Sequence, residues 1–89
     1  MSREEKIEDQ VRKILEQKEI YPFNITYTFE LSGGLLSVTV YEKADLEDLL
    51  DALSYYSQCD KSGYLVIPET CTVIMTGMAL LNLVMLWKI

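Results

Sequence analysis

Residues 70–89 read TCTVIMTGMALLNLVMLWKI and contain a single charged side chain, Lys88. Such an apolar segment can be a membrane span, a helix that is buried on all sides, or strands at the centre of a sheet. The choice among these three structures decides the fold, because the segment is a large part of an 89-residue chain and a chain of that length has only a small hydrophobic core.

A membrane span is disfavoured by residues within and beside the segment. The uncharged run from Cys71 to Trp87 is 17 residues long, which is at the lower limit for a spanning helix. Trp87 and Lys88 suit a membrane interface, but Asn82 would lie near the middle of the bilayer and no basic cluster flanks the run. An anchor formed by residues 71–87 is therefore kept only as an alternative.

A buried helix and a pair of strands are distinguished by where the polar residues fall. Positions 76, 82 and 88 are six apart, so in a helix they would point in three evenly spaced directions and leave no polar face. In strands the polar residues share one parity, and nearly all odd positions are apolar. The even-numbered polar residues are Thr70, Thr72, Thr76, Asn82 and Lys88.

This period of two predicts strands at about 70–75 and 79–88, joined by a turn at 76–78. Intrinsic propensity disagrees, because Met, Ala and Leu are good helix formers. A helix over residues 78–88 is therefore the alternative for the last segment.

The rest of the chain shows clearer periods. Ser2 and Glu5 form a capping box at the start of a helix over residues 2–19, and Pro22 ends it. Alternating residues on both sides of Ser32-Gly33-Gly34 predict a β-hairpin with strands at 25–31 and 36–41. Helical periodicity returns over 45–57, and residues 64–67 form a short apolar strand before Pro68.

These elements predict one α+β domain over residues 1–89. The expected order is α-β-β-α-β-β-β, with an antiparallel-rich sheet that carries two amphipathic helices on one face. In this arrangement Ile74, Val84 and Leu86 would face away from the core and need cover. A contact across a two-fold axis is the simplest cover, so we expect a homodimer through these three residues.

The segment EKADLEDLLD, residues 42–51, holds the main charge cluster of a chain whose net charge is −6. Its acids do not follow the alternate spacing with a central glycine of a calcium loop. They suit a solvated helix face or a docking patch for a basic protein partner, and a weak divalent site or a carboxylate acid–base pair is a lesser alternative. The residues of the expected patch are Glu42, Asp45, Glu47, Asp48 and Asp51.

Few residues suit catalysis or ligand binding. The chain has no histidine, and Cys59 and Cys71 are too few to complete a zinc site. We expect reduced thiols, with a Cys59–Cys71 disulfide as the alternative. The six tyrosines suit the boundary between core and water, or a small-ligand groove. We therefore predict no catalytic residues, no metal and no cofactor.

Composition and charge narrow the function further. The acidic balance disfavours direct contact with nucleic acid, and the absence of a signal-like start predicts a cytoplasmic protein. We expect a small, non-catalytic protein-binding module, a dimeric inhibitor or adaptor of the kind common in phages and mobile elements. The alternatives are a homodimer that binds or sequesters a small ligand, and an accessory protein anchored in a membrane by residues 71–87.

Overall fold

A computed structural model of the chain describes residues 2–30 and 33–85. Within these ranges the chain forms three α-helices and four strands, together with 3₁₀ turns at Lys61–Gly63 and Pro68–Thr70. The elements in chain order are α1 (Arg3–Glu16), β1 (Asn24–Glu30), β2 (Gly33–Thr39), α2 (Asp45–Ser57), β3 (Tyr64–Ile67), β4 (Thr72–Met75) and α3 (Gly77–Met85).

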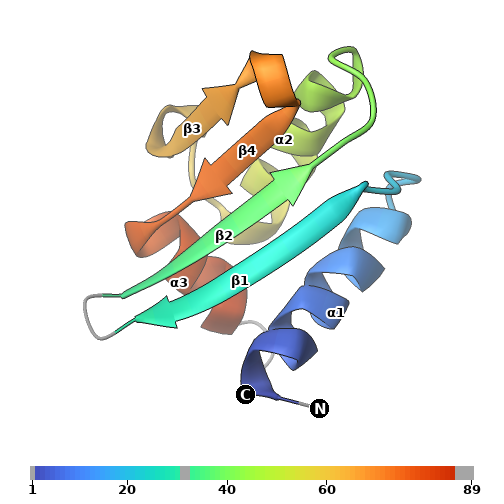
Figure 1. Ribbon diagram of the computed structural model, residues 1–89. Coiled ribbons are helices and arrows are strands. Elements are labelled where there is room, and N and C mark those ends of the chain that lie inside the picture. The colour runs from blue at the N-terminus through green and yellow to red at the C-terminus, as the bar shows by residue number, and fades with distance from the viewer. Residues whose placement is uncertain (1, 31–32, 86–89) are drawn as a thin grey trace.

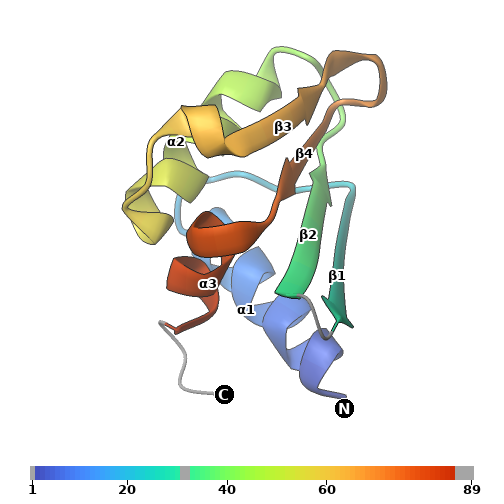
Figure 2. The same cartoon turned by 90° about the vertical axis from the view of Figure 1, so that its left-hand side faces the viewer.

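The four strands form one antiparallel sheet in the order β1-β2-β4-β3 (Figure 1). Figure 2 shows the sheet from its edge, with the helices gathered on one side of it. Val38 lies at the centre, opposite Ile25 on β1 and Val73 on β4, and all three side chains are buried. The protein is therefore a two-layer α+β domain, as predicted, with its core between the sheet and the helices.

The first helix forms for the reasons that the sequence indicates. Ser2 is the N-cap, its hydroxyl accepts a hydrogen bond from the backbone N–H of Glu5, and the Glu5 carboxylate accepts one from Ser2 in return. The elements α2 and β3 likewise occupy the ranges predicted for them. The apolar stripe of α1 is buried against the sheet. The buried residues of α1 are Ile7, Val11, Ile14 and Leu15.

The hairpin confirms both predicted strands, although β2 ends at Thr39 rather than at Tyr41 and residue 31 lies outside the described residues. Its glycines have a different place from the predicted one. Gly33 and Gly34 belong to β2 rather than to the turn. A Cβ atom on Gly34 would lie 2.8 Å from the Tyr27 hydroxyl oxygen and 3.3 Å from Leu80 Cδ2. Gly34 therefore allows a close approach between the hairpin and α3.

The last segment corrects the preferred prediction. The sheet contains β4 at Thr72–Met75, but residues 77–85 form the helix α3 and not a strand, which was the alternative. Residues 86–88 of the predicted strand lie outside the described residues. Gly77 adopts a left-handed conformation with φ of 63°, and there the chain leaves the sheet and turns back beneath it.

The period of two in the polar residues predicted a strand wrongly because those residues belong to different elements. Thr76 precedes α3 and Lys88 lies beyond its last described residue, so Asn82 is the one strongly polar residue in the helix. Its side-chain N–H group donates to the backbone carbonyl of Ser57 at 3.2 Å and to the Cys59 sulfur at 3.3 Å. Asn82 thus pairs with a carbonyl at the C-terminal end of α2, where helix carbonyls lack intrahelical partners. Because these hydrogen bonds satisfy the one strongly polar side chain of α3, the helix can form without a polar face toward water.

Within the described residues, the apolar run that begins at Cys71 is divided between β4 and the nine residues of α3. Over the described part of the chain, no helix combines the length and the apolar character that crossing a bilayer requires.

Substitutions in α3 distinguish the helix from the predicted strand. Leu80 and Leu83 are 3% and 0% exposed, because residues three apart share one helix face. In a strand they would point to opposite faces. We expect Leu80→Ala and Leu83→Ala each to lower the free energy of unfolding by about 2–5 kcal/mol in urea denaturation.

The matched control is Leu65→Ala, at a leucine of β3 that is 58% exposed. We expect this variant to lose less than about 1 kcal/mol, since it removes little buried surface. A Leu80→Ala variant as stable as Leu65→Ala would contradict the helix.

Candidate functional site

The five carboxylates predicted to form a docking patch differ in their surroundings. Glu42 is exposed in the bend before α2, and the other four lie on α2 itself. Asp45 and Asp48 are three residues apart and line a groove beside α2. Glu47 and Asp51 are four residues apart and both bind Lys61. Lys61 therefore compensates part of the charge of Glu47 and Asp51, whereas Asp45 and Asp48 have no basic partner among the described residues.

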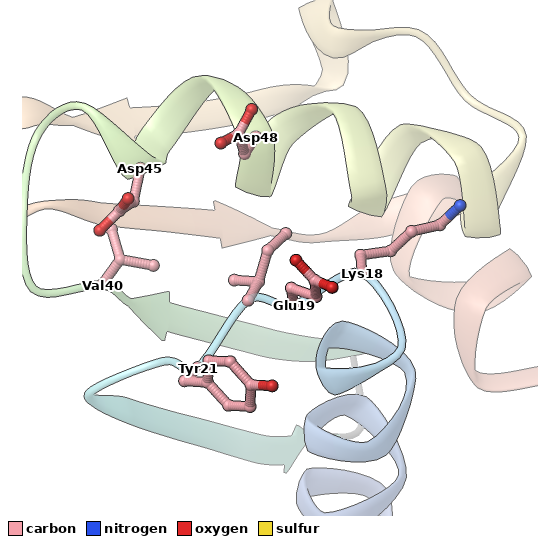
Figure 3. A pocket seen from close by; sticks show the side chains of 7 residues that line it. Lys18, Glu19, Tyr21, Val40, Asp45 and Asp48 are labelled. Carbon is pink, nitrogen blue, oxygen red and sulfur yellow. The ribbon is translucent and has the colours of Figure 1, made fainter.

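The groove runs between α2 and the connection that joins α1 to β1 (Figure 3). It has a volume of about 330 Å³, and both Asp45 and Asp48 reach it from α2. A second hollow of about 340 Å³ shares Lys18, Ile20 and Asp48 with it and continues along α2 to Asp51 and Ala52. The other residues that line the first hollow are Glu19, Tyr21 and Val40.

The charge of this groove is largely uncompensated. No ion pair within the described ranges joins Asp45, Asp48 or Glu19 to a basic side chain. Lys18 is the basic residue of the groove, but its Nζ lies 4.4 Å from the centre of the Tyr55 ring, a cation–π contact that directs it toward the other end of α2. Asp45 and Asp48 lie in the first turn of α2, where the helix dipole offsets part of their mutual repulsion.

Three exposed aromatic side chains lie at this end of the sheet. Tyr21 lines the groove and is 64% exposed. Phe23 and Tyr41 are also exposed, and their rings meet edge to face with centroids 5.3 Å apart. Tyr41 directly follows Val40, which lines the groove. The site therefore combines carboxylates with aromatic faces.

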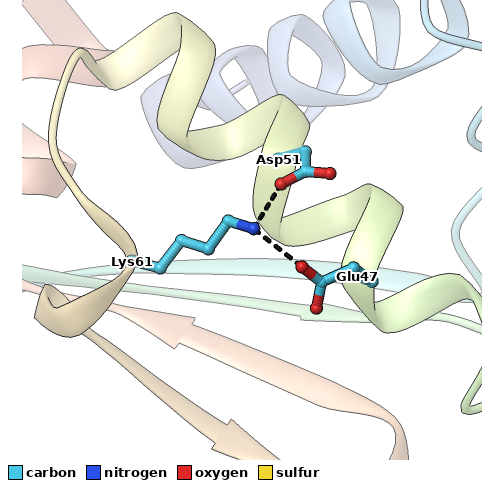
Figure 4. Close-up of polar contacts among 3 residues, drawn as sticks. All are labelled: Glu47, Asp51 and Lys61. Atoms are coloured by element: carbon cyan, nitrogen blue, oxygen red, sulfur yellow. Dashed lines mark hydrogen bonds and ion pairs between the residues drawn. The ribbon is translucent and has the colours of Figure 1, made fainter.

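Lys61 bridges the other two carboxylates of α2, Glu47 and Asp51. It precedes β3, and its Nζ binds Glu47 Oε1 at 2.8 Å and also Asp51 Oδ1 (Figure 4). Hydrogen bonds to Asp51 and then Glu47 raise the pKa of Lys61 above its ordinary value of 10.5. All three side chains are solvent-exposed, so the bridge adds little to stability. Its main effect is to compensate part of the negative charge on this side of α2.

The sequence did not indicate Tyr21 and Phe23 as site residues. Both flank Pro22, and no periodic pattern marks them as exposed. The six tyrosines do not line one common groove either. Tyr27 and Tyr64 are buried in the core, Tyr55 and Tyr56 pack on each other at the end of α2, and Tyr21 and Tyr41 lie near the acidic groove.

The three residues predicted for a dimer interface are not brought together. Ile74 lies on the open face of the sheet, opposite Ser37 and Leu65. Val84 lies in α3 and packs against the core on the other side of the sheet. Leu86 is outside the described residues. The sheet extension that was to carry this interface is not formed, because residues 77–85 are helical.

The two thiols are separate in the structure. Cys59 and Cys71 are both free and half-buried, as expected for reduced cysteines. Cys59 lies beside Asn82, whereas Cys71 is the left-handed residue between the second 3₁₀ turn and β4. Among the residues that the structure describes, no group of three or more His, Cys, Asp or Glu side chains is placed to hold a metal ion.

Comparison with known proteins adds no relative: the chain matches no family model, no curated protein and no solved structure. The groove and its charges are therefore the basis for a functional proposal.

The Lys61 bridge can be observed directly by NMR. We expect the Lys61 ammonium to titrate above pH 10.5, and its pKa to return to about that value in Glu47→Gln/Asp51→Gln. Because the folded state holds this proton more tightly, the stabilisation is complete below pH 10.5 and is lost only as the pH rises through the higher folded-state pKa. An unchanged Lys61 pKa in the double variant would contradict the bridge.

Proposed function

We propose that this chain is a small, non-catalytic module that binds a basic segment of another protein in the groove beside Asp45 and Asp48. The observation that carries the proposal is the division of the α2 carboxylates. Glu47 and Asp51 have a basic partner within the chain, whereas Asp45 and Asp48 have none among the described residues and line a groove. The groove thus holds negative charge that an external cation can neutralise.

The aromatic side chains favour arginine over a simple cation. A guanidinium group can lie flat on an aromatic ring while its N–H groups donate to a carboxylate. Tyr21 presents an exposed ring in the same groove as Asp45 and Asp48 (Figure 3). An arginine side chain that enters between α2 and the α1–β1 connection would meet both kinds of group.

The electrostatics of the whole chain support the same partner. A net charge of −6 attracts a basic surface over a distance of about one Debye length, which raises the association rate at low salt. Binding by charge needs no reacting group, in keeping with a chain that lacks histidine. An acidic module of this kind acts by occupying a basic surface, so it inhibits that partner or links it to another protein.

Matched charge removals test the groove. We expect Asp45→Asn/Asp48→Asn to weaken binding of a fluorescein-labelled peptide of alternating Arg and Ser by about tenfold, because both carboxylates face the peptide. The control, Glu42→Gln/Glu47→Gln, makes the same change in net charge at two exposed carboxylates that line neither hollow, and it should alter the dissociation constant by less than about twofold. Fluorescence anisotropy at two salt concentrations measures both variants.

An equal loss of affinity in the two double variants would mean that peptide binding depends only on net charge, which would contradict a specific groove.

A peptide of alternating Lys and Ser adds a test of the aromatic contact. We expect it to bind less tightly than the Arg peptide, and Tyr21→Ala to abolish that difference.

A further inference from the structure

Helix α3 exposes a row of apolar side chains on its outer side. Met78, Leu81 and Met85 are 67%, 50% and 65% exposed, and they recur at a spacing of three and four residues, which places them on one face. The opposite face packs into the core through Ala79, Leu80 and Leu83 (the three are at most 6% exposed). A helix that is apolar on both faces requires a second surface against its outer face.

A groove of about 700 Å³ runs beside this row, and it is larger than either acidic hollow. Met78 and Leu81 form one wall, and Phe29 and Gly34 from the end of the hairpin form the other. Gly34 lets the two walls approach, as its contacts with Tyr27 and Leu80 show. The one charged residue among those described as lining the groove is Arg3, whose guanidinium carbon lies 5.5 Å from the centre of the Phe29 ring.

We propose that a second copy of this chain covers the surface, with the row Met78, Leu81 and Met85 of each copy in the groove of the other. A ridge beside a groove on one face is self-complementary about a two-fold axis, which is the geometry of an isologous dimer. Charge selects this face for the contact. Two chains of net charge −6 repel each other, so two copies approach most easily where acids are absent, and the described lining of this groove contains none.

The exposed area also fits a dimer. Four large side chains line or extend the groove, namely Phe29, Met78, Leu81 and Met85. At about 100 Å² of exposed surface each they present roughly 400 Å², within the range of the largest patch on a stable monomer. Two copies would bury roughly 800 Å² from these side chains alone, and the smaller lining residues Thr76 and Val84 bring the contact near the lower bound of a specific interface.

The edges of the sheet offer less to a second copy. On β1, the backbone N–H of Tyr27 already donates to Glu8 Oε2 at 2.9 Å, so α1 occupies part of that edge. The edge at β3 is four residues long and ends at Pro68, which has no N–H to donate. The open sheet face carries hydroxyl groups between its aliphatic side chains, such as those of the exposed Thr26 and Thr28 on β1. These groups hydrate well, whereas the α3 groove does not.

Sedimentation velocity under reducing conditions tests the proposal. At about 100 μM, where a dimer of micromolar Kd is formed, we expect the wild-type chain to sediment at twice its mass of 10.3 kDa. Leu81→Glu and Met78→Glu each place a charge in the interface and should raise the dimer dissociation constant by at least about 100-fold. Leu65→Glu is the matched control, since Leu65 is 58% exposed on the open sheet face and should leave the dimer intact.

Circular dichroism checks that all variants fold, which we expect because each substituted side chain is at least half exposed. A wild-type monomer, or dissociation by Leu65→Glu and not by Leu81→Glu, would overturn the proposal.

Fluorescence of Trp87, the single tryptophan, identifies one competing occupant. A wild-type monomer whose emission shifts to longer wavelength in Leu81→Glu would show that the last residues of the same chain cover the groove, and this too would overturn the dimer.

Discussion

The fold of this protein depends on covering one face of a four-stranded sheet. The inner face carries buried side chains from every strand, such as Ile25, Val38, Val73 and Tyr64, and water must be excluded from all of it. Two helices would leave the end of the sheet nearest the hairpin loop uncovered. Helix α3 supplies the missing cover there, and Leu83 is fully buried as a result.

The two grooves lie where the helices on this face leave gaps at the two ends of α1. Beyond the C-terminal end, the connection to β1 and the start of α2 form the acidic groove with Tyr21. Near the N-terminal end, Arg3, the hairpin and α3 form the apolar groove. Figure 1 shows these regions at opposite ends of the fold. A dimer formed through the apolar groove would therefore leave both acidic grooves accessible, and two linked sites gain avidity for a partner with repeated basic segments.

The sequence predicts most of the fold because most elements carry a complete local signal. The capping box of Ser2 and Glu5, the alternation in the hairpin and the leucine stripe of residues 45–57 each depend on neighbours within one element. Helix α3 was missed because the parity of residues 76, 82 and 88 joined a turn, a helix and residues outside the described range. The Asn82 side chain is hydrogen-bonded to the Ser57 carbonyl at the end of α2, so it does not need to face water. A local sequence pattern cannot reveal a partner that is distant in the chain.

The candidate site was predicted only in part, for a similar reason. The sequence identifies all five acids, but it does not show that Lys61, which follows Asp51 by ten residues, binds two of them. It also gives no sign that the connection containing Tyr21 lies beside α2. Which carboxylates are paired and which are not is therefore decided by the fold. The fold places the unpaired Asp45 and Asp48 along a groove, which the sequence alone shows only as an excess of acidic residues.

The apolar groove, the core and the proposed dimer all depend on the placement of α3. NMR of the isotopically labelled chain tests it without any substitution. We predict helical Cα chemical shifts over residues 77–85 and a nuclear Overhauser contact between a Leu80 methyl group and Gly34, whose atoms lie close in the structure. Extended shifts over residues 79–85, with cross-strand contacts to β4, would contradict the account.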